Sequence, residues 1–86
     1  MKNCLVVDDS SVIRKVARRI LEELGFTVSE AEDGAQALHA CRHEMPFAIL
    51  LDWNIPAMDG FEFLKQLRQM DGGGAPTVVF CPTRQD

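Results

Sequence analysis

Three aspartates stand directly after, or at the end of, apolar runs in this sequence. Asp8 and Asp9 follow the apolar residues 5–7, and Asp52 follows the apolar residues 47–51. Carboxylates beside apolar segments are costly to keep charged unless a positive group neutralises them. Their type and placement therefore raise the question of which cation they hold.

The chemistry that these aspartates favour is phosphoryl transfer assisted by a magnesium ion. All the ligand atoms on offer are oxygens, which favours Mg²⁺ over zinc, and Mg²⁺ keeps several waters, so two or three protein ligands suffice. Asp52 stands alone at its strand end and is the candidate nucleophile that would form an acyl phosphate. Asp9, and to a lesser degree Asp8, would hold the metal. The structural alternative is that Asp8 and Asp9 only lead into a helix while Asp52 opens a turn.

Hydrophobic patterning predicts the elements that would bring these aspartates together. Buried-type strands are expected at 3–7, 47–51 and 77–81, and an alternating strand at 26–31. Helices are expected after Ser10 or Ser11 up to Gly25, from Gly34 to about residue 43 with Asp33 as cap, and from about Gly60 to about residue 70.

Two of these helices carry apolar residues at helical spacing. The stripe of the first helix consists of Val12, Ile13, Val16, Ala17, Ile20, Leu21 and Leu24. The third helix is expected to bury Phe61, Leu64 and Leu67, with Phe63 as a further candidate. The basic residues of the first helix are expected on its outer side, as a solvated face or a docking surface for a partner protein; they are Arg14, Lys15, Arg18 and Arg19.

The element order predicts an α/β fold with one doubly wound parallel sheet. Strands that alternate with helices form parallel sheets with right-handed crossovers, and their functional groups lie at the carboxyl ends of the strands. With the strand order 2-1-3-4, the ends of the first and third strands are neighbours, so Asp8, Asp9 and Asp52 would converge in one crevice.

The bulk properties predict one small cytoplasmic domain spanning 1–86. Its formal net charge of −4 argues against nucleic-acid binding, and its longest apolar run, 47–51, is too short to span a membrane. Its three cysteines (Cys4, Cys41 and Cys81) are expected to be buried, reduced thiols rather than a zinc site, although a redox role stays open.

The sequence also resembles a known family. The segments LVVDDSS and ILLDWNIPAMDGFEFLKQLR closely resemble the receiver domain of two-component response regulators, especially the chemotaxis-type ones, over nearly all of 1–83. The resemblance implies a flavodoxin-like fold and an Asp52 that accepts a phosphoryl group from a sensor histidine kinase or a phosphotransfer protein. It further implies that Mg²⁺ is bound by the side chains of Asp9 and Asp52 and the main-chain carbonyl of Asn54, with Asp8 assisting. Such a domain phosphorylates itself and is not an enzyme that turns over an outside substrate.

The sequence departs from the family pattern after the fourth strand. The position of the family's switch hydroxyl aligns with Pro82, so that Thr83 would substitute only after a one-residue shift. No fifth strand with its lysine and no final helices follow, since the last lysine is Lys65. The chain is therefore either a truncated receiver with weak switching or a fragment of a longer protein, and the sequence leaves both open.

The missing elements predict an uncovered surface. Part of the sheet face near the third and fourth strands is expected to be bare, and the fourth strand is an open apolar edge. We expect self-association through that edge or face. The alternative function is thus a degenerate receiver that serves as a protein-interaction or dimerisation module without switching. A haloacid-dehalogenase-like phosphatase ranks low, because Asn54 stands where its second aspartate would be.

Overall fold

The elements of the fold follow the predicted order. A computed structural model describes residues 2–52, 55 and 58–81. The elements are β1 (Asn3–Val7), α1 (Ser11–Glu23), β2 (Thr27–Ala31), α2 (Gly34–His43), β3 (Ala48–Asp52), α3 (Gly60–Arg68) and β4 (Thr77–Cys81). Their bounds lie within two residues of the predicted ones.

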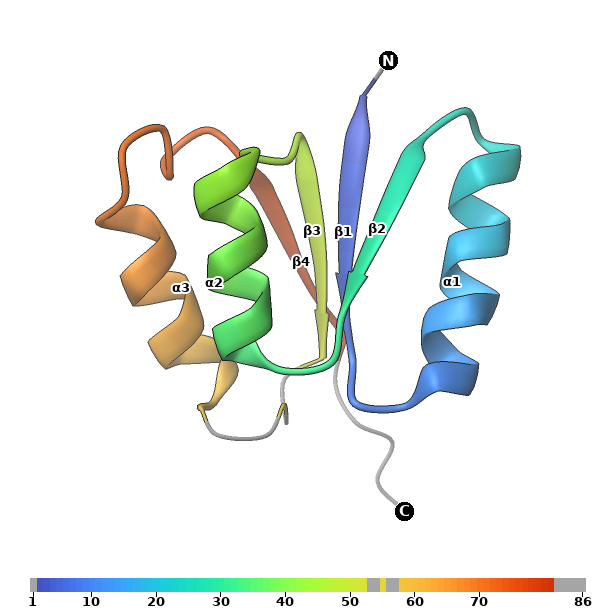
Figure 1. Cartoon of the computed structure of the whole chain (residues 1–86), viewed down its shortest axis with the longest axis horizontal. Helices are drawn as coiled ribbons and strands as arrows, with labels where there is room; N and C mark the ends of the chain where they lie inside the picture. The colour runs from blue at the N-terminus through green and yellow to red at the C-terminus, as the bar shows by residue number, and fades with distance from the viewer. Residues whose placement is uncertain (1, 53–54, 56–57, 82–86) are drawn as a thin grey trace.

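The four strands of the described residues form one parallel sheet in the order β2-β1-β3-β4. Figure 1 shows α2 and α3 on one face of this sheet and α1 on the other. The arrangement is a doubly wound, flavodoxin-like α/β fold, which confirms the predicted fold class. Within the described part of the chain, no fifth strand accompanies the sheet.

Side-chain caps set the start of each helix. Ser10 Oγ accepts a hydrogen bond from the Ile13 amide at 3.2 Å, and Asp33 accepts one from Gln36 at 2.8 Å. Gly25 ends α1 in the left-handed region (φ 97°), where a glycine costs no strain. Because these caps start the helices a few residues after the strands, the loops at the carboxyl ends of β1 and β2 are short.

The main core lies between the sheet and the α2–α3 layer. Its fully buried members are Leu5, Val7, Ala37, Ile49, Leu51, Phe63 and Leu67, with further apolar side chains packed around them. Phe63 is 0% exposed, whereas Phe61 is 64% exposed. The prediction that Phe61 is buried was wrong, because α3 turns its Phe63–Leu67 side toward the sheet.

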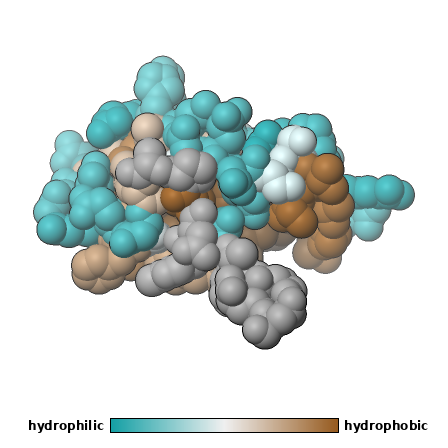
Figure 2. Space-filling model, turned by 90° about the horizontal axis from the view of Figure 1, so that it is seen from below, coloured by the Kyte–Doolittle hydropathy of each residue, from teal (hydrophilic) through white to brown (hydrophobic). Residues whose placement is uncertain are grey.

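The opposite face of the sheet is only partly covered. None of the residues of α1, all of which are described, is buried, and Val12, Val16 and Ile20 are 54–69% exposed. Most of the apolar stripe of α1 is therefore exposed. Among the described residues, α1 packs mainly over β1 and β2, and Val79 of β4 is 47% exposed. Figure 2, seen from the carboxyl ends of the strands, shows hydrophobic surface on the side of α1.

Candidate functional site

The aspartates are brought together by the register of two central strands. In the parallel pair β1–β3, Val7 is the partner of Leu51, so both strands end at the same edge of the sheet. Asp8 directly follows β1, and Asp52 is the last residue of β3. Residues that are far apart in the sequence therefore become neighbours at the carboxyl ends of the strands, where ligands bind in open α/β sheets.

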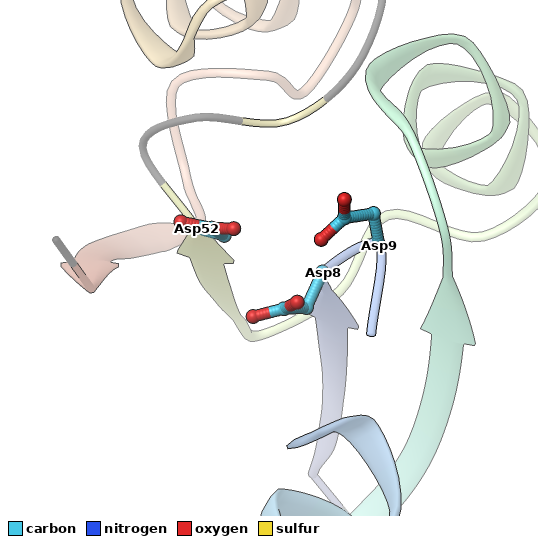
Figure 3. A group of neighbouring side chains, drawn as sticks. All are labelled: Asp8, Asp9 and Asp52. Atoms are coloured by element: carbon cyan, nitrogen blue, oxygen red, sulfur yellow. The ribbon is translucent and has the colours of Figure 1, made fainter. Parts of the chain in front are cut away.

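The three carboxylates converge on a common space, as Figure 3 shows. One carboxylate oxygen from each of Asp8, Asp9 and Asp52 lies within 4.8 Å of the others. Asp52 is only 9% exposed, Asp8 is half-buried and Asp9 is exposed. The cluster thus has a fixed, little-exposed carboxylate on one side and a solvent-facing one on the other.

Asp8 is held in place through three of its groups. Its amide donates to the Ala31 carbonyl at 3.1 Å, and its carboxylate accepts from the Ser10 amide at 2.9 Å. Its main-chain carbonyl accepts from Arg14 Nη1 at 2.7 Å. The turn that carries Asp8 and Asp9 is therefore attached to β2 and α1 as well as to β1.

The electrostatics of the cluster favour a cation. Burial raises the pKa of Asp8, and the carboxylates of Asp52 and Asp9 raise it further against the lowering effect of the Ser10 amide. A divalent cation would remove this repulsion between like charges. Because the donor set consists of carboxylate oxygens, the residues present fit Mg²⁺.

A group of charges beside the cluster was missed by the sequence reasoning. Arg14, Lys15 and Arg18 of α1 all contact Glu30 of β2, at 2.9, 3.3 and 2.7 Å. The side chain of Arg14 is 13% exposed, so the prediction of an outward basic face was wrong for this residue. Arg19, at 84% exposed, does face solvent. The sequence did contain a signal for this grouping: Arg14 and Arg18 are four residues apart, and the predicted second strand contains an acidic residue.

Cys81 occupies the strand end next to Asp52. It is the last residue of β4 and the register partner of Asp52. Burial raises the pKa of its thiol, and the carboxylates of Asp52 and Asp8 raise it further. The predicted ligand Asn54 and the positions Pro82 and Thr83 lie outside the residues that the structure describes.

Comparison with known proteins identifies the family. The family described as "Response regulator receiver domain" matches residues 4–86. The chain belongs to this family. Receiver domains bind Mg²⁺ through an acidic pocket, and in this chain a cluster of three aspartates lies at the ends of β1 and β3.

Individual relatives agree with this assignment. The receiver domain is 41% identical over 75 residues to the response regulator MprA of Mycobacterium ulcerans, and these residues are 87% of the chain and 32% of that protein. A protein of Pseudomonas aeruginosa is 39% identical over 87 residues, which are 100% of the chain and 41% of that protein. The chain thus spans less than half the length of these two relatives.

Solved structures show the same fold. The chemotaxis response regulator CheY4 of Vibrio cholerae superimposes with a TM-score of 0.92 at 32% identity, over 100% of this chain and 72% of that one. A CheY-like receiver domain from Methylobacillus flagellatus gives a TM-score of 0.86 at 27% identity, over 98% and 71% of the two chains. Among the helices of the described residues, none is long and apolar enough to cross a membrane.

Proposed function

We propose that this receiver domain is a Mg²⁺-dependent phosphoacceptor in two-component signalling. Asp52 takes a phosphoryl group from a sensor histidine kinase or a phosphotransfer protein in the cytoplasm. Asp8, Asp9, Asp52 and the main-chain carbonyl of Asn54 are the proposed ligands of the metal. The observation that carries the proposal is the approach of three carboxylates within 4.8 Å at the ends of two adjacent strands.

The three aspartates of the cluster differ in exposure, and their proposed roles differ accordingly. Asp52 is held at the end of a central strand and is 9% exposed, so its carboxylate meets an incoming phosphoryl group in a fixed position. A carboxylate oxygen bonds to phosphorus while the bond between phosphorus and the donor histidine breaks, and the released imidazole takes up a proton. The metal, when bound, neutralises charge on the phosphoryl oxygens. The more exposed Asp9 leaves an entry path for the hydrated ion.

Phosphoryl labelling tests the proposed role of Asp52. We expect the wild-type domain to take label from a phosphorylated histidine kinase or from acetyl phosphate only when Mg²⁺ is present, and Asp52→Asn to take none. Asp33→Asn is the matched control, because it removes an acidic group at the start of α2, outside the cluster, and asparagine caps a helix as well as aspartate. Label that persists in Asp52→Asn would contradict the proposal, and intact mass spectrometry measures it.

A second candidate function is self-association without switching. Two observations favour it, namely the 52–69% exposure of the outward apolar residues of α1 and the 47% exposure of Val79 on the edge strand β4. Apolar surface and an unprotected strand edge both favour contact with another chain.

Light scattering over a range of protein concentrations tests this second function. We expect the wild-type mass to rise with concentration. Val16→Lys should abolish the rise if the α1 face is the contact, and Val79→Lys should abolish it if the exposed sheet face at β4 is the contact. Lys15→Gln, on the same helix but at a charged position, should leave the rise unchanged. A monomeric wild-type mass at every concentration rejects self-association.

A further inference from the structure

Arg14 connects three separate elements beside the acidic cluster. Its side chain starts from α1, its Nε donates to Glu30 Oε1 of β2 at 2.9 Å, and its Nη1 donates to the main-chain carbonyl of Asp8 at 2.7 Å. With 13% of its side chain exposed, the guanidinium is held against the protein and not extended into solvent. One residue thus spans the helix, the edge strand and the turn that carries Asp8 and Asp9.

The contact with the Asp8 carbonyl bears directly on Asp9. A peptide unit is planar, so the carbonyl oxygen of Asp8 lies in one plane with the amide and Cα of Asp9. Holding that oxygen restricts the plane and therefore the position of the Asp9 Cα, from which the Asp9 side chain extends. Because Asp9 is the exposed member of the cluster, it depends most on such a constraint.

Glu30 in turn fixes Arg14. Its carboxylate also accepts from Arg18 and Lys15, so three cations surround one anion. Burial raises the pKa of Glu30, but the hydrogen bonds from Arg18, Arg14 and Lys15 outweigh burial and lower the pKa to about 2. Glu30 is therefore ionised at physiological pH and gives the guanidinium a permanent anchor.

We infer that Arg14 is a positioning residue that holds the Asp8–Asp9 turn in the geometry that binds a divalent cation. This inference rests on the proposed function, because it takes the cluster to be a cation site. Arg14 does not contact the ion in this scheme. It acts through the Asp8 carbonyl, and its planar guanidinium can satisfy Glu30 and that carbonyl at the same time, as a lysine ammonium at the end of a flexible stem does not.

The charge and the geometry of Arg14 act in opposite directions on cation binding. A guanidinium near the site repels the ion, so removal of the charge alone would tighten binding. Loss of the two-point contact loosens the turn and weakens binding. Arg14→Lys separates the two effects because it keeps the charge and removes the planar fork.

Arg18→Lys is the matched control. Arg18 contacts the same carboxylate at 2.7 Å, but it lies one helical turn further from Asp8 and pairs with Glu22 at 3.2 Å. Both substitutions therefore weaken the attachment of α1 to Glu30, and only Arg14→Lys alters the contact with the turn. Equal changes in thermal stability would show that the two variants perturb the fold to the same degree.

A Mg²⁺ titration followed by calorimetry gives the first readout. We expect Arg14→Lys to weaken Mg²⁺ binding roughly tenfold, the lower end of the range for partners that orient metal ligands, and Arg18→Lys to change it less than twofold. Equal affinities in the two variants, or tighter binding in Arg14→Lys, would overturn the inference.

Amide hydrogen exchange without metal gives the second readout. The Ser10 amide donates to the Asp8 carboxylate within the turn, so its exchange rate reports how well the turn is held. We expect faster exchange at Ser10 in Arg14→Lys than in Arg18→Lys, and equal rates would reject the positioning role. If Ser10 responds while the wild-type domain binds no Mg²⁺, the positioning of the turn stands and the proposed metal site fails.

Discussion

At the scale of single residues, the acidic cluster opposes folding when no cation is present. Asp8 is half-buried, and its pKa is raised by burial and by the carboxylates of Asp52 and Asp9. A charge whose pKa is raised in the fold lowers stability at neutral pH. Repulsion between the carboxylates would favour metal binding, and it thus lowers the stability of the metal-free domain.

Asp8→Asn should therefore stabilise the metal-free domain. The amide oxygen of asparagine can still accept from the Ser10 amide, so the substitution removes charge and keeps the hydrogen bond. At pH 7 without divalent cations we expect the free energy of unfolding to rise by about 0.5–2 kcal/mol, as is usual when a functional site is relieved of strain. Chemical denaturation measures it, with Asp33→Asn as control. A loss of stability in Asp8→Asn would contradict this explanation.

Glu30→Gln should show a characteristic pH dependence. The pKa of Glu30 is lowered in the fold from 4.5 to about 2, since the hydrogen bonds from Arg18, Arg14 and Lys15 outweigh burial. The ionised carboxylate therefore stabilises the fold above pH 4.5, and this contribution is lost as the pH falls toward 2. We expect Glu30→Gln to lower the free energy of unfolding by about 1–3 kcal/mol at pH 7. Denaturation at a series of pH values should show the difference closing between pH 4.5 and 2, whereas a constant difference would rule out this linkage.

The sequence predicted the cluster but not the contacts that surround it. Asp8, Asp9 and Asp52 were predictable because each stands at the carboxyl end of a strand, and strand ends in a parallel sheet share one edge. The grouping of Arg14 and Arg18 around Glu30 was not, because periodicity shows which residues share a helix face and not which strand that face meets. The roles of Asn54 and Thr83, which lie outside the described residues, stay predictions.

At the scale of elements, the two helical layers should respond differently to truncation. Val16 of α1 is 54% exposed, and Phe63 of α3 is fully buried. We expect Val16→Ala to change the free energy of unfolding by less than about 0.5 kcal/mol, as for most surface positions. Phe63→Ala should lower it by about 3–5 kcal/mol. Urea denaturation of both variants measures this, and a large loss in Val16→Ala would mean that the stripe is packed in solution.

The loop between α3 and β4 contains a glycine that its packing requires. A Cβ at Gly73 would overlap the Leu67 carbonyl, whereas a Cβ at Gly74 meets nothing within 4 Å. Arg68 Nη1 also donates to the carbonyls of Gly73 and Pro76, at 2.7 and 3.0 Å, so the loop is tied to the end of α3.

Two alanine substitutions test this loop. Gly73→Ala should lower the free energy of unfolding by about 1–3 kcal/mol, the usual cost of a steric overlap that the backbone must relieve. Gly74→Ala should leave it unchanged or raise it slightly, because alanine restricts the unfolded chain. Thermal denaturation compares the two, and equal effects would contradict the predicted overlap.

Element bounds were more predictable than the faces of the helices. Capping residues such as Ser10 and Asp33 and the terminating Gly25 mark helix ends locally, so the bounds could be found without tertiary information. The choice between Phe61 and Phe63 depends on how α3 rotates against the sheet. Both phenylalanines fit an apolar pattern, and only packing against Ile49, Leu51 and their neighbours selects Phe63.

At the scale of the whole molecule, the proposed metal should stabilise the fold. A ligand that binds only the folded state at ten times its dissociation constant adds about 1.4 kcal/mol, and for a domain of this size the melting temperature rises by about 6–11 °C. We expect this rise with Mg²⁺ and not with NaCl at equal ionic strength. Chelation should reverse it, and Asp9→Asn should reduce it. An equal response to both salts would argue against a specific site.

The architecture as a whole could be predicted because three kinds of signal agree. Alternating strands and helices predict the parallel sheet, handedness predicts which helices share a face, and the family resemblance gives the strand order. How far α1 covers its face of the sheet was predictable only in outline. The detail depends on where α1 sits along the sheet; no side chain of α1 is buried, and Arg14 and Arg18 pair with Glu30 of β2.

The uncovered stripe of α1 has a consequence for the fate of the polypeptide in a living cell. Chaperones and proteases act on exposed apolar segments, and small losses of stability change cellular abundance several-fold. We expect this chain, produced as these 86 residues, to be retained by chaperones and to have a short half-life. A binding partner that shields α1 would then control how much of the signalling module survives, independently of phosphorylation.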